Sequence, residues 1–163
     1  MCIRDSLKDS AFRQRMVSEP PVIPDVDVAD LYRVIAGGWF AQFEMGPDFN
    51  YEPTQADTIA TRAAAAGVTG AEYAYDLLMK DEGKGFIYFP ILNYRDGNLN
   101  FLEDLQEADD TVNSLSDGGA HCGTICDAAS PTFMLQHWVR DRERKRIGLE
   151  LSLIHISEPT RPY

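Results

Sequence analysis

Residues 69–93 read TGAEYAYDLLMKDEGKGFIYFPILN and contain two hydrophobic patterns in succession. Thr69 and Glu72 have the spacing of a capping box, in which each side chain bonds the other residue's backbone N–H, so they predict the start of a helix. Apolar residues recur at helical spacing behind this start, at Ala74, Leu77 and Leu78. Residues 86–92 are then continuously apolar, which is typical of a short strand buried on both faces.

The residues that follow extend this pattern toward a parallel sheet. Asn98 is placed to cap a short helix, which would bring together Phe101, Leu102 and Leu105. Residues 112–116 predict a brief strand, and residues 132–142 predict a further helix. Strand, helix, strand and helix in this order are typical of parallel βαβ units, so we expect an α/β fold.

Before residue 69 the hydrophobic pattern is interrupted more often by glycines, prolines and polar residues. Thr54 is placed to cap a helix over residues 55–65, and Gly67 is placed to end it. Two short apolar runs separated by a glycine pair predict strands at residues 31–36 and 39–43. The remaining segments are expected to form one helix and two loops, at residues 7–17, 18–27 and 46–53.

The composition narrows the classes of function. The chain has 163 residues, with 15 Lys and Arg against 26 Asp and Glu, which gives a formal net charge of −11. This charge disfavours binding to nucleic acid and to anionic membranes. No run is long and apolar enough to predict a transmembrane helix, no secretory signal is visible, and three cysteines are too few for a disulfide framework. We therefore expect a cytoplasmic protein.

The two ends differ in character from the rest. Residues 1–6 read MCIRDS, and residues 151–163 read LSLIHISEPTRPY. Both resemble peptides translated from sequencing-adapter DNA at the edges of an assembled fragment, so we expect them to be artefacts that flank a native segment, residues 7–150. Cys2 and His155 are therefore left out of the functional argument. The alternative is that both ends are genuine.

The stretch LSDGGAHCGTICDAASPTF, residues 115–133, places a carboxylate at the end of a predicted strand. Asp117 is followed directly by Gly118 and Gly119, which would let a substrate or a metal approach the backbone closely. In α/β folds, working residues lie on the loops that follow the carboxyl ends of strands. Asp117 is therefore a candidate catalytic carboxylate, and an ordinary turn is the alternative.

Three stretches resemble the amidohydrolase superfamily. They read NYEP, GVTGAEYAYDLLMKDEGKGFIYFPILNYRDGNL and LSDGGAHCGTICDAASPTFMLQHWVRDR, at residues 50–53, 67–99 and 115–142. Within the superfamily the similarity is to the N-acyl-D-amino-acid deacylases, or D-aminoacylases, and it covers roughly residues 7–150. The resemblance implies a metal-dependent (β/α)8 barrel, a TIM barrel, of which this chain is an incomplete C-terminal portion containing the late βα units.

The resemblance also implies a role for Asp117. In the family, the aspartate at the end of the last barrel strand is the general base, which takes a proton from the attacking water and passes it to the leaving amine. Zinc polarises the amide carbonyl and lowers the pKa of its bound water. The other metal ligands come from earlier strands and begin with an H-x-H pair, which this sequence lacks. We therefore expect no complete metal site in this chain, with Asp117 at most a weak ligand.

Four further residues are candidates for contact with the substrate. Asn93 follows the preceding predicted strand, whereas Gly118, Gly119 and His121 share the loop of Asp117. Each has a simpler interpretation as well. Asn93 is suited to capping a turn, His121 to a structural hydrogen bond, and the glycines to a backbone that needs conformational freedom.

Other conspicuous residues favour structural roles. Cys122 and Cys126 lack the second pair of ligands that a zinc site needs. His137 and Trp138 fall inside a predicted helix and are expected to pack there. Residues 140–146 mix both signs of charge, which is typical of a solvated helix end.

The expected function is hydrolysis of a linear amide C–N bond, with a small N-acyl amino acid as substrate and zinc as cofactor in a longer parent enzyme. The fragment alone is expected to be inactive. Two alternatives stay open. One is a hydrolase of cyclic amides, similar to dihydroorotases and hydantoinases, and the other is a non-catalytic binding module derived from a barrel. The oligomeric state is left open.

Overall fold

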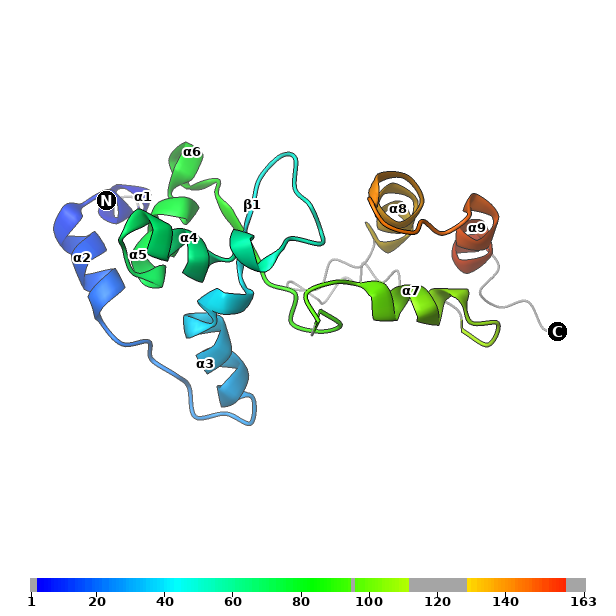
Figure 1. Cartoon of the computed structure of the whole chain (residues 1–163). Coiled ribbons are helices and arrows are strands. Elements are labelled where there is room, and N and C mark those ends of the chain that lie inside the picture. The colour runs from blue at the N-terminus through cyan, green and yellow to red at the C-terminus, as the bar shows by residue number, and fades with distance from the viewer. Residues whose placement is uncertain (1–2, 95, 112–128, 158–163) are drawn as a thin grey trace. The chain divides into compact units, whose positions relative to one another are not determined.

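The computed structural model describes residues 3–94, 96–111 and 129–157, and the chain divides into two compact units, Met1–Asn98 and Leu99–Tyr163. The segment that we expected to be one barrel portion, residues 7–150, contributes to both units. The described residues form a helix-rich α and β structure with a small two-stranded sheet, so the fold is α/β in the broad sense (Figure 1). No helix in this part of the chain has the length and apolar character needed to cross a bilayer.

The first unit consists of helices that lie beside a short antiparallel sheet (Figure 1). In chain order its helices are α1 (Ile3–Leu7), α2 (Ser10–Ser18), α3 (Ala29–Gly37), α4 (Ile59–Ala66), α5 (Gly70–Leu78) and the short α6 (Lys80–Gly83). Two 3-10 turns, η1 (Trp39–Ala41) and η2 (Gln55–Asp57), precede strand β1 (Phe43–Met45) and helix α4. Strand β2 (Phe86–Tyr88) pairs antiparallel with β1, so that Glu44 lies opposite Ile87.

Side-chain caps define the ends of α4 and α5. The predicted capping box of α5 is confirmed, because Thr69 Oγ1 accepts from Glu72 N at 3.2 Å while the Glu72 carboxylate accepts from Thr69 N at 2.9 Å. Helix α4 is capped by Thr58 instead of Thr54, and Thr54 begins η2. Gly67 ends α4 in the left-handed conformation, with φ of 70°, as the sequence predicts.

The core of the first unit lies where α4 and α5 meet β1. Its fully buried apolar side chains are Phe43, Ile59, Ala63, Ala74 and Leu77. Gly70 lets α5 approach η1 closely, because a Cβ at that position would lie 2.3 Å from the ring of Trp39. On the other side of α5, Arg13 Nε and Nη2 bond the two carboxylate oxygens of Asp76 at 2.8 and 2.6 Å and hold α2 in place.

Three further predictions about this unit are wrong. Residues 31–36 belong to helix α3, and residues 39–43 are mostly the 3-10 turn η1, with Phe43 alone in a strand. The strand predicted at 86–92 is limited to β2, and the Phe86 side chain is 65% exposed instead of buried. The reason is that β2 has one neighbour in the described residues, and Pro90 has no N–H with which to extend the pairing.

The second unit is helical in its described residues. It contains α7 (Asn100–Glu107), α8 (Ser130–Phe133), the π-helical segment η4 (Met134–Asp141) and α9 (Leu149–Ser157). The helix predicted at residues 132–142 corresponds to α8 and η4, whereas the cap of α7 is Leu99 and not Asn98. Helix α9 begins before residue 151 and contains the buried Ser152. The strand predicted at residues 112–116 lies outside the described residues.

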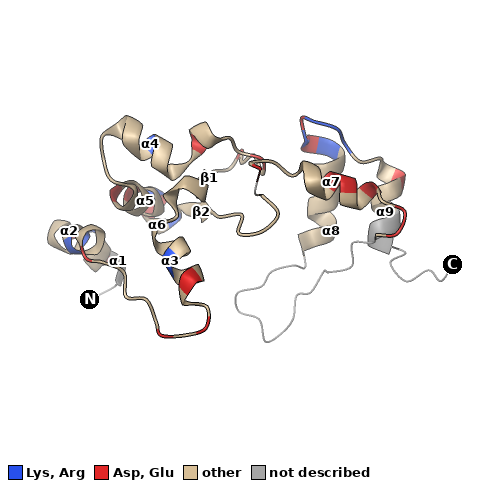
Figure 2. Ribbon diagram, turned by 60° about the horizontal axis from the view of Figure 1, so that its bottom comes forward, with Lys and Arg blue, Asp and Glu red and all other residues tan. Residues whose placement is uncertain are grey.

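Arg142 holds the second unit together. Its side chain is 1% exposed and pairs with the Glu103 carboxylate of α7, and it donates to Asn100 Oδ1 at 2.9 Å. The guanidinium also lies 4.7 Å from the ring centre of the buried Trp138. The prediction that His137 and Trp138 pack inside a helix is therefore confirmed, but residues 140–146 are not uniformly solvated. Figure 2 shows the acidic residues of α7 and the basic residues with which they pair.

Replacing Arg142 by Met should destabilise the second unit by about 3 kcal/mol, because it leaves the buried Glu103 carboxylate without its main partner. Urea unfolding followed by circular dichroism measures this difference. Arg140→Met is the matched control, because Arg140 is an exposed residue that pairs with the neighbouring Asp141. Equal unfolding free energies for the two variants would show that the buried pair does not hold the unit together.

Candidate functional site

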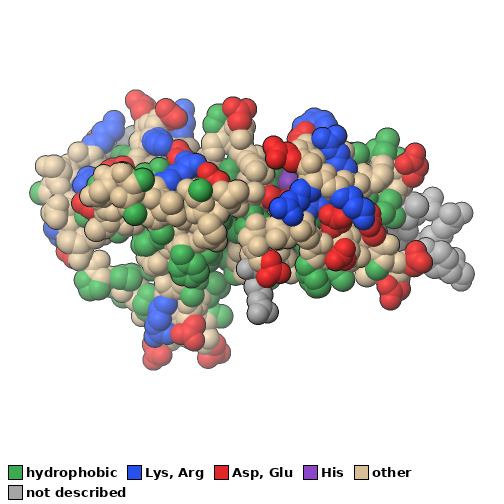
Figure 3. Space-filling model, in the orientation of Figure 1, with side chains coloured by type: hydrophobic (Ala, Val, Ile, Leu, Met, Phe, Trp, Pro, Cys, Tyr) green, Lys and Arg blue, Asp and Glu red, His purple; other side chains and the backbone are tan. Residues whose placement is uncertain are grey.

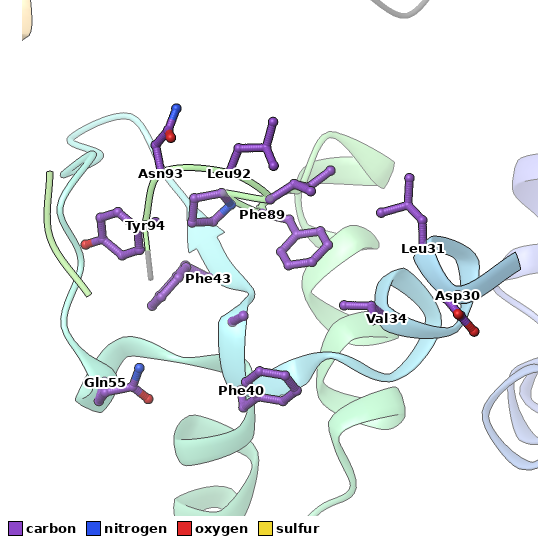
Figure 4. Close-up of a pocket in the computed structure, with 13 residues that line it drawn as sticks. Asp30, Leu31, Val34, Phe40, Phe43, Gln55, Phe89, Leu92, Asn93 and Tyr94 are labelled. Atoms are coloured by element: carbon purple, nitrogen blue, oxygen red, sulfur yellow. The ribbon is translucent and has the colours of Figure 1, made fainter. Parts of the chain in front are cut away.

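The first unit contains a pocket of about 590 Å³, a volume typical of small-molecule sites. Helix α3, turn η1, strand β1 and the segment that follows β2 each contribute to its walls (Figure 4). The lining residues are Asp30, Leu31, Val34, Phe40, Ala41, Phe43, Gln55, Phe89, Pro90, Ile91, Leu92, Asn93 and Tyr94. The pocket therefore joins segments that are up to about sixty residues apart in the chain.

Gln42 fixes the position of α3 against the sheet. Its side-chain Nε2 donates to Ile35 O, in the last turn of α3, at 2.7 Å. Its own carbonyl oxygen accepts from Ile59 N, at the start of α4, at 2.8 Å. Gln42 is 3% exposed, and its bond to Ile35 O is partly sheltered from water. This one residue thereby aligns the α3 wall of the pocket with β1.

Aromatic rings form the wall opposite α3. Phe43 makes an edge contact with Tyr94, and the hydroxyl of Tyr94 donates to Pro53 O at 2.7 Å. Phe43 also lies 6.3 Å from Tyr88, ring centre to ring centre, and Tyr88 continues into an edge-to-face contact with Phe49. Such ring pairs stabilise by about 0.5–1.5 kcal/mol beyond the area they bury. They hold the segment after β2 in the position that closes the pocket.

Charged side chains hold β1 from its other face. The Glu44 carboxylate pairs with Lys80 of α6 and with Arg62 of α4, the latter at 3.0 Å. Arg62 also pairs with Asp57 at 3.1 Å. The hydroxyl and the backbone N–H of Thr54 both donate to Asp57 and hold the pKa of that carboxyl below its usual range, and Arg62 adds to this effect. None of these groups lines the pocket, so we assign them a structural role.

Asn93 is the one predicted site residue that the structure describes. It lines the pocket and has φ of 62°, a left-handed conformation that asparagine tolerates better than most residues. The interpretation of Asn93 as a turn-capping residue and its contact with a substrate both stay predictions. Asp117, Gly118, Gly119 and His121 lie outside the described residues, as do Cys122 and Cys126.

The pocket also contains residues that the sequence analysis did not single out. Phe40 and Gln55 come from short 3-10 turns, which leave no regular hydrophobic period in the sequence. Leu31 and Val34 were assigned to a strand, although their spacing of three also fits one face of a helix. This i, i+3 pair of apolar residues is the sequence signal that could have predicted helix α3.

The described residues contain no metal site of their own. No group of three or more His, Cys, Asp or Glu side chains lies close enough together in them to hold a metal ion. The pocket walls supply one carboxylate, Asp30, which pairs with Arg33. Residues 3–94, 96–111 and 129–157 therefore do not fit a zinc ion.

Raising the pH from 10 to 12 should lower the free energy of unfolding, and Tyr88→Phe should reduce this slope. Burial, with Tyr51 and Glu52 nearby, raises the pKa of Tyr88 to about 12, above the value of about 10 for an unfolded tyrosine. In this window the unfolded chain loses the Tyr88 proton first, so it binds fewer protons than the folded chain and is favoured as the pH rises. Urea titrations at a series of pH values measure the slope. Identical slopes with and without the hydroxyl would contradict the assignment.

Comparison with protein-family models, with curated protein sequences and with solved structures finds no match. The pocket of the first unit is therefore characterised from its own lining residues alone. It is a mainly apolar pocket of small-molecule size, with two carboxamides and a paired carboxylate among its lining residues. Such a site is suited to binding a neutral molecule with an apolar part.

Proposed function

We propose that this chain is part of a metal-dependent amidohydrolase that hydrolyses the linear amide bond of an N-acyl-D-amino acid. The observation that carries the proposal is the stretch SDGGAH at residues 116–121, which resembles the loop of the family that carries the general base. The extended similarity over residues 67–99 and 115–142 supports it. The finer fold assignment, the late βα units of a (β/α)8 barrel, is part of the same proposal.

In this proposal Asp117 moves the proton. Its carboxylate takes a proton from the attacking water as the C–O bond to the acyl carbon forms, and it delivers that proton to the amine nitrogen as the C–N bond breaks. The products are a carboxylic acid and a free amino acid, so atoms and charge balance. Gly118 and Gly119 carry no side chains that would obstruct the approach of the substrate to the carboxylate.

The zinc ion belongs to the proposed parent enzyme. The described residues do not fit it, and the sequence contains no H-x-H pair, so its ligands would come from further residues of a longer protein. A cytoplasmic location is part of the same proposal, because three cysteines are too few for the disulfide framework of a secreted protein.

In the proposed longer parent enzyme, Asp117→Asn should lower kcat for N-acetyl-D-amino acids by roughly 10²- to 10⁴-fold, because the side-chain amide cannot accept the proton of the attacking water. Zinc content, measured on the same preparations, should be unchanged. Asp110→Asn is the matched control, since Asp110 is an exposed carboxylate seven positions earlier.

Near-normal turnover by Asp117→Asn would overturn the assignment of the base. A parent enzyme that hydrolyses dihydroorotate or hydantoins, and not N-acyl-D-amino acids, would overturn the proposed substrate class. Loss of zinc in the variant would show that Asp117 acts as a ligand instead of as a base.

A further inference from the structure

We infer that the pocket of the first unit binds a neutral amide that carries an aromatic or branched apolar group. This inference goes beyond the proposed hydrolysis, because binding in the pocket requires neither Asp117 nor a metal ion. The two can therefore fail separately. The pocket lies entirely within residues 30–94, in one compact unit.

The apolar part of the ligand is indicated by the floor of the pocket. In Figure 4 the rings of Phe40, Phe43 and Phe89 lie around its centre, with Val34 of α3 beside them. Phe43 is fully buried, whereas Phe40 is 64% exposed and would lose contact with water when a ligand covers it. Figure 3 shows that hydrophobic side chains also gather over α3, next to the pocket. Covering such apolar surface is the main favourable term in binding.

The polar part of the ligand is indicated by two carboxamides. Gln55 and Asn93 both line the pocket and lie apart from one another in Figure 4. Both residues are exposed, and neither side-chain amide has a hydrogen-bond partner among the described residues, so both are available to a ligand at the mouth of the pocket. A carboxamide offers one acceptor and two donors, which match the C=O and N–H of an amide. Two such groups at the rim of an apolar floor favour a ligand with amides on either side of its apolar group.

The charge of the site favours a neutral ligand. Asp30 is the one charged residue among those that line the pocket, and its carboxylate is 95% exposed and pairs at the surface with Arg33. A charged ligand would lose hydration on entering the pocket. The described walls contain no buried side chain of opposite charge that would compensate for this loss.

The test is a titration of the 163-residue chain with N-acetylphenylalaninamide, followed by ¹H–¹⁵N correlation spectra. We expect saturable shifts at Phe40, Gln55 and Asn93. N-acetylglycinamide, which has the same two amides and no ring, should bind at least about tenfold more weakly, as burial of an aromatic side chain predicts.

Two variants at phenylalanines of nearly equal exposure distinguish binding in the pocket from non-specific binding to exposed apolar surface. Phe40→Ala should weaken binding roughly tenfold, since it removes part of the floor. Phe86→Ala should leave the affinity unchanged, because Phe86 is 65% exposed in the same unit and does not line the pocket. Gln55→Leu keeps the apolar floor and should weaken binding of the amide by a smaller factor.

Equal affinities for Phe40→Ala and Phe86→Ala would overturn the inference, as would the absence of saturable binding. A third result would also overturn it. If sedimentation shows a dimer that Phe40→Ala converts to a monomer, the pocket is covered by a second copy of the chain instead of by a small molecule.

Discussion

Gln42 links three elements of the first unit, α3, β1 and α4. Its side chain bonds the last turn of α3 through Ile35 O, and its backbone carbonyl bonds the first residue of α4, Ile59. One such hydrogen bond contributes about 1 kcal/mol. Its position matters more than its strength, because α3 contributes an apolar wall of the pocket and has no buried residue of its own. Without this link, α3 would keep few contacts that fix its direction.

Sequence reasoning succeeded where local chemistry decides the structure. The capping box of Thr69 and Glu72 and the left-handed Gly67 depend on near neighbours, so both ends could be predicted correctly. It failed where apolar runs were short. Residues 31–36 fit a strand and a helix equally well by hydrophobicity, and contacts such as that of Gln42, which lie outside the run, decide between them. Buried Arg142 was missed for the same reason, because its partner Glu103 is 39 residues away.

The candidate site divides in the same way. Asn93 was singled out because it follows a predicted strand, and it does line the pocket, with a left-handed backbone conformation. Phe40 and Gln55 could not be found, since short 3-10 turns carry no periodic signal. Asp117 rests on the resemblance of its sequence context, and it lies outside the described residues. The proposed chemistry and the observed pocket are therefore two separate results, each with its own test.

The most direct test of this account is amide hydrogen exchange, measured by NMR on the 163-residue chain. Ile59 N–H donates to Gln42 O in a fully buried position, so we predict that it is among the slowest-exchanging amides of the first unit. Gln42→Leu should accelerate the exchange of Gly38 N–H, which bonds Val34 O at the end of α3. If Ile59 exchanges as fast as an exposed loop amide such as that of Asp48, Gln42 does not join these elements and the pocket is not preformed.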